Sequence, residues 1–563
     1  MIRVQVSINI LLVYALLQSA FWNPSAINDG VIYPQSVVVS NGGVLYRDIQ
    51  QQYGSFIPML QGLILKLLGF ELWKSRMVGM IIFLATGYLL LYLLLKRFSL
   101  NKSLIVLNFY FASFSSWSSF STDFWPGEGL VWPNYYGVFL ILVTYICLLK
   151  LNTKKSFNNG VRVYLTIIGL CIFFMPMVRL EFVFPAAICI LWTFHKIKKS
   201  KNDLVYFTLI LLFLNTIWLF YLASNKSLSF SIEQIILPLI SGNYDSLLPS
   251  LEASSRMAFV LLLQIFIITT LFFFVQKKNH SPRSQASLIL IAFILFSLLG
   301  FLTYKERDVS NLIYSLTRLI FADFIGVIGQ FIVISALVLI CINLITYLAP
   351  RFGTFRQISM NSRTDNFGLT ILSLSLIPQV IHNFSYEYFH MILPIYLIFL
   401  LDFELKFQKF NSIFPVFAFN VLFAATFSSL AIFFYANSLQ TYTFSSGNLT
   451  KMKMHSFEKY SYYNWIDQNV SKYKKEKLLF ACPVGLFSVH NDRYVVDSIY
   501  PMPGLTIDIL DQILERVDDD SLVLDCQNEK IFKQIESSSE YSILESFRID
   551  SDQYAYLYRQ KTN

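Results

Sequence analysis

Carboxylates and an arginine gather in a polar segment that follows the first apolar run of the chain. Residues 27–59 contain Asp29, Arg47 and Asp48, together with several glycines that favour turns. A carboxylate in such a place can take a proton from an attacking hydroxyl group. Asn-Asp-Gly is also ordinary turn chemistry, so a solvated turn is the structural alternative for Asp29. For Asp48 the alternatives are positioning of an acceptor or a local ion pair with Arg47.

Further ionisable groups stand at the ends of other apolar runs. Asp123 and Glu128 offer oxygen ligands to a divalent cation such as Mg²⁺ or Mn²⁺, or they cap a membrane loop anchored by nearby tryptophans. Arg179 and Arg307 can bind a phosphate through their forks of donors, or they can snorkel to lipid headgroups. Because these charges avoid the interiors of the apolar runs, they predict a site at a membrane–water boundary.

The composition identifies the setting of these residues. The chain has 563 residues, of which 55% are hydrophobic and 14% are charged. A soluble fold cannot bury so much apolar surface, so the sequence predicts a polytopic α-helical membrane protein. The net charge of +9 comes from basic residues in short connections between apolar runs. That placement is typical of membrane topology and excludes a nucleic-acid partner.

The uncharged runs predict about 13 transmembrane helices, each near the length that a bilayer requires. They are 4–22, 77–95, 103–120, 135–149, 163–178, 182–194, 204–224, 257–275, 284–304, 324–348, 366–386, 391–401 and 411–436. Residues 56–70 form an apolar stretch too short to span, which we interpret as an interfacial or re-entrant helix. We interpret 4–22 as a retained anchor rather than a cleaved signal peptide.

The basic connections alternate with less basic ones along the chain. The positive-inside rule places the basic connections in the cytoplasm and the segment 23–76 outside, as an outer loop. The odd number of spans then places the C-terminal residues 437–563 outside as well. The predicted organisation is a transmembrane domain, residues 1–436, followed by a small α/β extracytoplasmic domain, residues 437–563.

The C-terminal residues 437–563 are more polar than the preceding ones. Their apolar residues form short strand-like stretches and helical patterns instead of long uncharged runs. Stretches with strand-like composition occur at 478–484, 493–498, 521–526 and 554–559. Apolar residues recur at helical spacing in 506–517 and 529–537. This pattern predicts a small α/β domain, and we find no catalytic motif in it.

The stretch 28–79 resembles the first outer loop of the GT-C superfamily, which comprises membrane glycosyltransferases that use polyprenyl-phosphate-linked sugars. The matching residues occur in the family's order: Asp29, Gly43, Tyr46-Arg47-Asp48, Tyr53-Gly54, Gly69 and Arg76. The segment EYFHMILP, residues 387–394, is similar to a late outer-loop motif of the family. Three positions depart from the pattern: Asn28 in place of a second acid, Ser55 in place of proline, and Glu387-Tyr388 in place of an aspartate.

The resemblance implies an inverting glycosyltransferase that moves a sugar from a polyprenyl phosphate to a hydroxyl group. It implies Asp29 as the catalytic base, and it adds His390 to Arg179 and Arg307 as candidates for binding the donor phosphate. The acceptor would be a lipid-linked glycan, an envelope polysaccharide or a protein. No tightly bound cofactor is implied, and a divalent cation at Asp123 and Glu128 stays open.

Two other functions fit a multispan protein with polar outer loops. One is an O-antigen-type polysaccharide polymerase, although polymerases usually carry their large polar loops between late spans. The other is a lipid or solute transporter, which would usually place ionisable groups nearer the middle of the membrane. The expected location is a bacterial cytoplasmic membrane, with an endoplasmic-reticulum membrane as the alternative.

Overall fold

The computed structural model describes most of the first 235 residues and parts of the C-terminal residues. The described residues are 2–24, 28–48, 54–96, 98–114, 133–151, 159–235, single positions between 372 and 430, 440–445, 447–473, 477–480, 489–490, 493–494, 521–525, 541–548 and 554–560. The runs expected as spans between 257 and 436 therefore lie outside the described residues, apart from those single positions.

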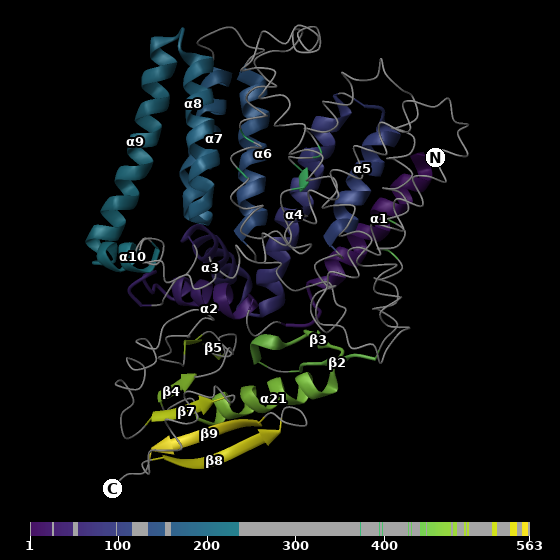
Figure 1. Cartoon of the computed structure of the whole chain (residues 1–563), viewed down its shortest axis with the longest axis vertical. Coiled ribbons are helices and arrows are strands. Elements are labelled where there is room, and N and C mark those ends of the chain that lie inside the picture. The colour runs from purple at the N-terminus through teal and green to yellow at the C-terminus, as the bar shows by residue number, and fades with distance from the viewer. Residues whose placement is uncertain are drawn as a thin grey trace, which may run out of the picture.

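Long apolar helices stand side by side and form a bundle (Figure 1). These helices are α1 (Ile2–Ser19), α4 (Leu72–Leu95), α5 (Leu100–Ser113), α6 (Pro133–Leu151), α7 (Asn159–Val178), α8 (Val183–Ile197) and α9 (Lys201–Ser224). They coincide with the first seven apolar runs expected as spans. Within the described part of the chain, six helices are long and apolar enough to cross a membrane: 2–19, 72–95, 133–151, 160–178, 180–197 and 201–224.

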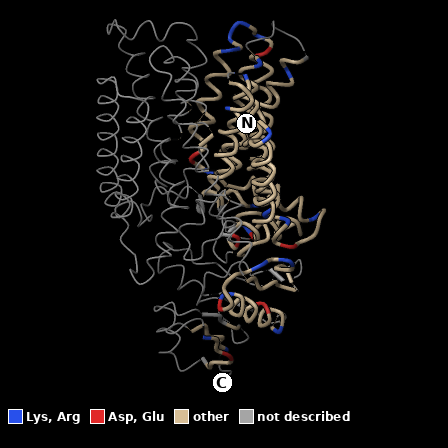
Figure 2. Tube along the Cα trace, turned by 90° about the vertical axis from the view of Figure 1, so that its right-hand side faces the viewer, with Lys and Arg blue, Asp and Glu red and all other residues tan. Residues whose placement is uncertain are grey.

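Successive helices of the bundle alternate in direction, so their connections alternate between its two ends. The turn from α8 to α9 carries Lys198 and Lys199 and lies at the end farther from the C-terminal elements (Figure 1). Figure 2 shows further Lys and Arg residues gathered at that end. The opposite end holds the short helix α10 (Leu228–Ile235) and the C-terminal elements.

Two helices lie across one end of the bundle in the segment expected as an outer loop (Figure 1). Helix α3 (Phe56–Leu68) confirms the helix expected over 56–70, whereas α2 (Asn28–Ser40) was not expected. The two helices pack closely at Gly62. A Cβ atom added to this glycine would lie only 2.7 Å from the carbonyl oxygen of Ser36. Among the described residues of the segment 23–76, 28–40 and 56–68 are therefore helical, and Gly30 belongs to α2.

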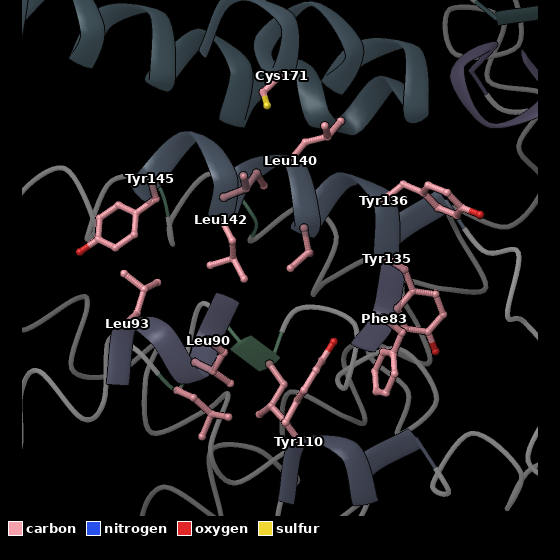
Figure 3. Close-up of a cluster of buried hydrophobic side chains, with 14 of the residues drawn as sticks. Phe83, Leu90, Leu93, Tyr110, Tyr135, Tyr136, Leu140, Leu142, Tyr145 and Cys171 are labelled. Carbon is pink, nitrogen blue, oxygen red and sulfur yellow. The ribbon is translucent and has the colours of Figure 1, made fainter. Parts of the chain in front are cut away.

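Aromatic side chains fill the core where α4, α5 and α6 meet (Figure 3). The ring of Phe83 lies 4.7 Å from that of Tyr110, 5.2 Å from that of Phe114 and 5.4 Å from that of Tyr135, measured between centroids. All four side chains are buried. Such contacts add to the stabilisation from apolar burial, and they hold the bundle at the end that faces α2 and α3.

The C-terminal elements comprise helix α21 (Phe457–Lys472) and several strands. The strands are β2 (Tyr442–Thr443), β3 (Lys453–Met454), β4 (Lys477–Phe480), β5 (Val489–His490), β6 (Arg493–Tyr494), β7 (Ser521–Asp525), β8 (Tyr541–Arg548) and β9 (Tyr554–Gln560). One sheet has the strand order β4-β7-β9-β8, in which only the β4–β7 pair is parallel. Strands β2 and β3 pair with each other, as do β5 and β6.

Strands β4, β6, β7 and β9 lie at the four stretches expected as C-terminal strands, as far as those stretches are described. Strand β8 and helix α21 were not expected, because Glu545 and Arg548 break the apolar pattern of β8 and polar residues dominate α21. The expected helices 506–517 and 529–537 lie outside the described residues.

The C-terminal elements share a hydrophobic core with the helices across the end of the bundle. Tyr33 of α2, Leu65 of α3 and Leu72 of α4 belong to the same buried cluster as Met454 of β3 and Ile466 of α21. Burying apolar surface on both sides of this contact holds the C-terminal elements against α2, α3 and α4.

Candidate functional site

Asp29 forms a buried ion pair with Arg76 at the junction of α2 and α4. Arg76 Nη2 lies 2.6 Å from Asp29 Oδ2, and Arg76 Nε lies 3.0 Å from Oδ1 and 3.2 Å from Oδ2. Both side chains are 0% exposed. A solvated turn at Asp29 is therefore excluded. The carboxylate lies in the first turn of α2, where the positive end of the helix dipole also favours a negative charge.

Arg76 also binds the backbone that connects α1 to α2. Its Nη1 donates to the carbonyl oxygen of Trp22, and its Nη2 donates to that of Asn23 at 2.8 Å. One guanidinium thus holds the residues after α1 and the first turn of α2 in a fixed relation. The charge is buried together with its counter-ion and several acceptors, as a charge in a low-dielectric interior requires.

A buried hydrogen-bond network next to Arg76 connects the surrounding helices. Ser75 donates to Gln61 Oε1, and Gln61 Nε2 donates to the hydroxyl oxygen of Tyr136 at 2.9 Å. Ser36 of α2 also donates to Gln61 Oε1, at 3.4 Å. The network joins α2, α3, α4 and α6, so the helices that carry Asp29 and Arg76 are fixed to the bundle.

The motif Tyr46-Arg47-Asp48 follows α2 and contacts the C-terminal end of α9. Arg47 Nε donates to Asp48 Oδ1 at 2.7 Å, and Arg47 Nη1 donates to the carbonyl oxygen of Asn225 at 3.2 Å. Asp48 Oδ2 also accepts from the backbone N–H of Val44 at 2.7 Å. The local ion pair is therefore present, and it closes a turn that rests on α9.

The pKa values of Asp48 and Tyr46 in this motif are shifted, and Tyr46 has an unusual backbone conformation. The Arg47 guanidinium lowers the pKa of Asp48, and the hydrogen bond from Val44 acts in the same direction. Tyr46 is buried and has a φ angle of 69°, a left-handed conformation that is uncommon for a residue other than glycine. Burial raises the pKa of Tyr46 to about 12.

Arg179 lies between α7 and α8, where the chain turns back into the bundle. Its Nε lies 2.8 Å from Glu181 Oε2, and the Arg179 side chain is 11% exposed. The start of α3 packs beside this turn, because the N–H of Gly54 donates to the carbonyl oxygen of Val178 at 3.2 Å. The structure thus brings the Arg179 turn next to α3, whereas Asp29 lies where α1, α2 and α4 meet.

The remaining predicted site residues, Arg307, His390, Asp123 and Glu128, lie outside the described residues. Among the residues that the structure does describe, no group of three or more His, Cys, Asp or Glu side chains is arranged to hold a metal ion. The predicted donor-phosphate contacts of Arg307 and His390, and the metal ligands, therefore stay predictions from the sequence.

Sequence reasoning placed Arg76 in the motif but gave it no role, and it did not single out Asn23. A signal for Arg76 was available, since a charged residue in an apolar helix such as 72–95 normally has a partner. The identity of that partner depends on how α2 folds back over α4. Asn23 carries no comparable signal, because its contacts are made mainly through its backbone.

No family model matches the chain, and no curated protein matches it significantly. Among solved structures, it is similar to ArnT from Cupriavidus metallidurans bound to undecaprenyl phosphate, with 11% identity, a TM-score of 0.45 and coverage of 98% of this chain and 97% of that chain. It is also similar to the Archaeoglobus fulgidus oligosaccharyltransferase complexed with Zn and sulfate, with 12% identity, a TM-score of 0.47 and coverage of 94% and 70%.

A third similar structure is AglB from Archaeoglobus fulgidus in complex with an inhibitory peptide and a dolichol-phosphate, with 12% identity, a TM-score of 0.46 and coverage of 98% of this chain and 74% of that chain. ArnT and the oligosaccharyltransferase are glycosyltransferases of the GT-C superfamily, the family that the sequence motifs resemble. At these identities and TM-scores, the similarities alone assign no reaction to this chain.

Proposed function

We propose that this chain is a membrane glycosyltransferase that moves a sugar from a polyprenyl-phosphate donor to a hydroxyl group, with Asp29 as general base. The observation that carries the proposal is the buried Asp29–Arg76 pair at the junction of α1, α2 and α4. The motif between residues 28 and 79 also supports the proposal. Asp29 lies near its start and Arg76 near its end, and these two residues form an ion pair in the folded chain.

The proposed reaction needs one carboxylate. Asp29 takes the proton of the acceptor hydroxyl as the hydroxyl oxygen forms a bond to the anomeric carbon. The bond from that carbon to the phosphate oxygen breaks, and prenyl phosphate leaves with the electron pair. The leaving group is already an anion and needs little protonation, unlike the leaving alcohol in glycoside hydrolysis, where a second carboxyl group acts as acid. Direct displacement inverts the anomeric carbon.

Arg76 suits this role as the residue that holds the base. Its two-point contact fixes the plane of the carboxylate and the direction of its oxygen atoms. A buried ion pair gives little net stability compared with well-packed apolar residues. Its presence at this junction therefore favours a functional role over a purely structural one.

The location fits a donor that is half lipid and half sugar. Helices α2 and α3 lie across the end of the membrane-crossing bundle (Figure 1). On α3 the buried face includes Ile57 and Leu65, while Leu63 and Leu67 on the other side are 59% and 74% exposed. A helix with an exposed apolar face in this orientation is typical of the boundary between lipid and water. The prenyl chain can thus remain in lipid while the phosphate reaches the site.

The finer assignments extend the proposal to the other site residues predicted from the sequence. Arg179, Arg307 and His390 are proposed to bind the donor phosphate, and the Arg47–Asp48 pair to shape the acceptor side of the site. Asp123 and Glu128 remain proposed ligands for a divalent cation. Measuring prenyl-phosphate release after EDTA treatment tests this assignment. The proposed acceptor is a lipid-linked glycan, an envelope polysaccharide or a protein, on the outer face of a bacterial cytoplasmic membrane.

The decisive experiment measures release of prenyl phosphate from a panel of polyprenyl-phosphate sugars by the purified full-length protein in lipid nanodiscs. The test variant is Asp29→Asn/Arg76→Gln, which removes both charges together and keeps hydrogen-bonding side chains. We expect its turnover to fall by about 10²- to 10⁴-fold, the usual contribution of a general base. The control is Glu545→Gln, which alters an exposed ion pair with Lys472 in the C-terminal elements.

Full turnover by the Asp29→Asn/Arg76→Gln variant would show that Asp29 is not the base. Absence of prenyl-phosphate release by the wild-type protein with every donor would reject the glycosyltransferase itself. Transport of a solute that survives the double substitution would favour a transporter instead.

A further inference from the structure

The residues between α1 and α2 form a strand-like contact with the C-terminal elements. The N–H of Asn23 donates to the carbonyl oxygen of Lys453 at 2.7 Å, and the N–H of Lys453 donates to that of Phe21, also at 2.7 Å. Trp22 and Lys453 thereby form a parallel bridge. Strand β3, some 430 positions later in the chain, is thus hydrogen-bonded to the backbone that leads into Asp29.

Asn23 is the residue at which this contact meets Arg76. Its N–H binds β3, its carbonyl oxygen accepts from Arg76 Nη2 at 2.8 Å, and its Oδ1 accepts from the N–H of His455 at 3.4 Å. Its φ angle is 42°, in the left-handed region. Asparagine adopts this conformation more readily than most residues, because its short side chain can hydrogen-bond locally. This conformation directs the N–H toward β3 and the carbonyl oxygen toward Arg76.

Strand β3 is itself held in place on both sides. It pairs with β2, and its residue Met454 is 2% exposed in the core shared with α2, α3, α4 and α21. The ring of His455 meets that of Trp22 edge-on, with centroids 6.0 Å apart. A fixed β3 therefore gives Asn23 a fixed reference, because hydrogen bonds and apolar contacts both resist its movement.

We infer that Asn23 is a positioning residue through which β3 sets the position of Arg76 and, through Arg76, of Asp29. The inference rests on the proposed function of Asp29. The chain of contacts is continuous: β3 to Asn23, Asn23 to Arg76, and Arg76 to Asp29. The C-terminal elements are therefore part of the machinery that orients the base, because a small displacement of a reacting group can cost about 10²-fold in rate.

The test compares two substitutions that differ in their tolerance of a left-handed backbone. Asn23→Gly keeps that conformation and the backbone hydrogen bonds, and it removes only the bond to His455. Asn23→Val disfavours the conformation, because a β-branched side chain at positive φ is strained. We expect Asn23→Gly to retain kcat within about threefold, and Asn23→Val to lower kcat by about 10- to 100-fold with the donor KM little changed.

A double-mutant cycle with Arg76→Lys tests whether Asn23 acts through Arg76. Lysine keeps the charge but loses the fork that contacts Asp29 and Asn23 together. We expect Asn23→Val to add little to the loss already caused by Arg76→Lys, since both substitutions disturb one chain of contacts. Effects that multiply independently, or an Asn23→Val enzyme with wild-type kcat, would overturn the inference.

Lys453→Pro provides a second test should Asn23→Val reduce the yield of folded protein. Proline removes the N–H that binds Phe21 and leaves Asn23 and Arg76 intact. We expect the same fall in kcat, whereas the Glu545→Gln control keeps wild-type activity. A fully active Lys453→Pro enzyme would also overturn the inference. Inactive wild-type protein would instead reject the proposed function, so the two failures are distinguishable.

Discussion

Asp29 and Arg76 lie 47 positions apart in the sequence and meet in a fully buried ion pair, with 2.6 Å between Oδ2 and Nη2. Removing either partner alone leaves a buried charge without its counter-ion. We expect Asp29→Asn or Arg76→Met to lower the free energy of unfolding by about 3–5 kcal/mol. Unfolding of the purified protein in detergent measures this loss.

The apolar pair Asp29→Leu/Arg76→Met separates stability from catalysis. Because apolar residues of similar size can replace a buried ion pair at little cost, we expect this variant to unfold near the wild-type temperature. We also expect its release of prenyl phosphate to fall by about 10²- to 10⁴-fold, since it has no base. A stable double variant that remained active would identify the pair as structural.

The Arg47–Asp48 pair predicts a pH-dependent turn at residues 44–48. Arg47 lowers the pKa of Asp48 from its ordinary value of 3.8, so the stabilisation of the turn is fully present above that value and is lost as the pH falls below it, through the lowered pKa. We expect the protection of the Val44 N–H against hydrogen exchange, taken relative to its intrinsic rate at each pH, to fall in that acidic range. In Asp48→Asn this protection should not change with pH in the acidic range, and a protection factor that still falls there would contradict the prediction.

The backbone around Gly54, where the start of α3 meets the end of α7, leaves no room for a side chain. A Cβ added there would lie 1.8 Å from the carbonyl oxygen of Met177, which is a backbone atom and cannot rotate away. We expect Gly54→Ala to lower the free energy of unfolding by more than the roughly 1–3 kcal/mol usual for overpacking. Gly42→Ala is the matched control: its Cβ meets nothing within 4 Å, although its φ angle of 86° adds backbone strain of about 1–2 kcal/mol.

Arg179 predicts an effect on donor binding rather than on turnover. Under the proposed function it contacts the donor phosphate, and its Nε is held by Glu181 at 2.8 Å. We expect Arg179→Gln to raise the donor KM by about tenfold, corresponding to the loss of roughly 1.4 kcal/mol of binding, with kcat less affected. Steady-state kinetics with a fixed acceptor measures this. A change confined to kcat would contradict the assignment.

A polar cluster inside the bundle predicts a change in stability without a change in activity. Asn108 is 0% exposed and donates to Gln5 Oε1 at 3.0 Å, and it accepts from Asn9 at 2.9 Å. Hydrogen bonds between membrane helices average about 0.6 kcal/mol and reach about 1.7 kcal/mol. We expect Asn108→Leu to lower the free energy of unfolding by that amount and to leave prenyl-phosphate release unchanged. Loss of release in a folded Asn108→Leu protein would place this cluster in the reaction.

The sequence by itself determined the helices of the bundle, because the length and purity of an apolar run are local properties. The runs from 4–22 to 204–224 each correspond to a helix of the described structure, and 56–70 to α3. The sequence also singled out Asp29, Asp48 and Arg179 as charges at the ends of apolar runs. It failed for α2, because glycine, asparagine and proline near its start and middle are typical of loops.

Only the tertiary structure decided which charge meets which. Arg76 has Lys74 and Glu71 near it in the sequence, and its partnership with Asp29 instead depends on α2 folding back across the start of α4. The contact of Asn23 with β3 depends on the C-terminal elements packing against α2, α3 and α4. Local patterns reflect burial and period along one segment, whereas hydrogen bonds between distant segments form only when the whole chain has packed.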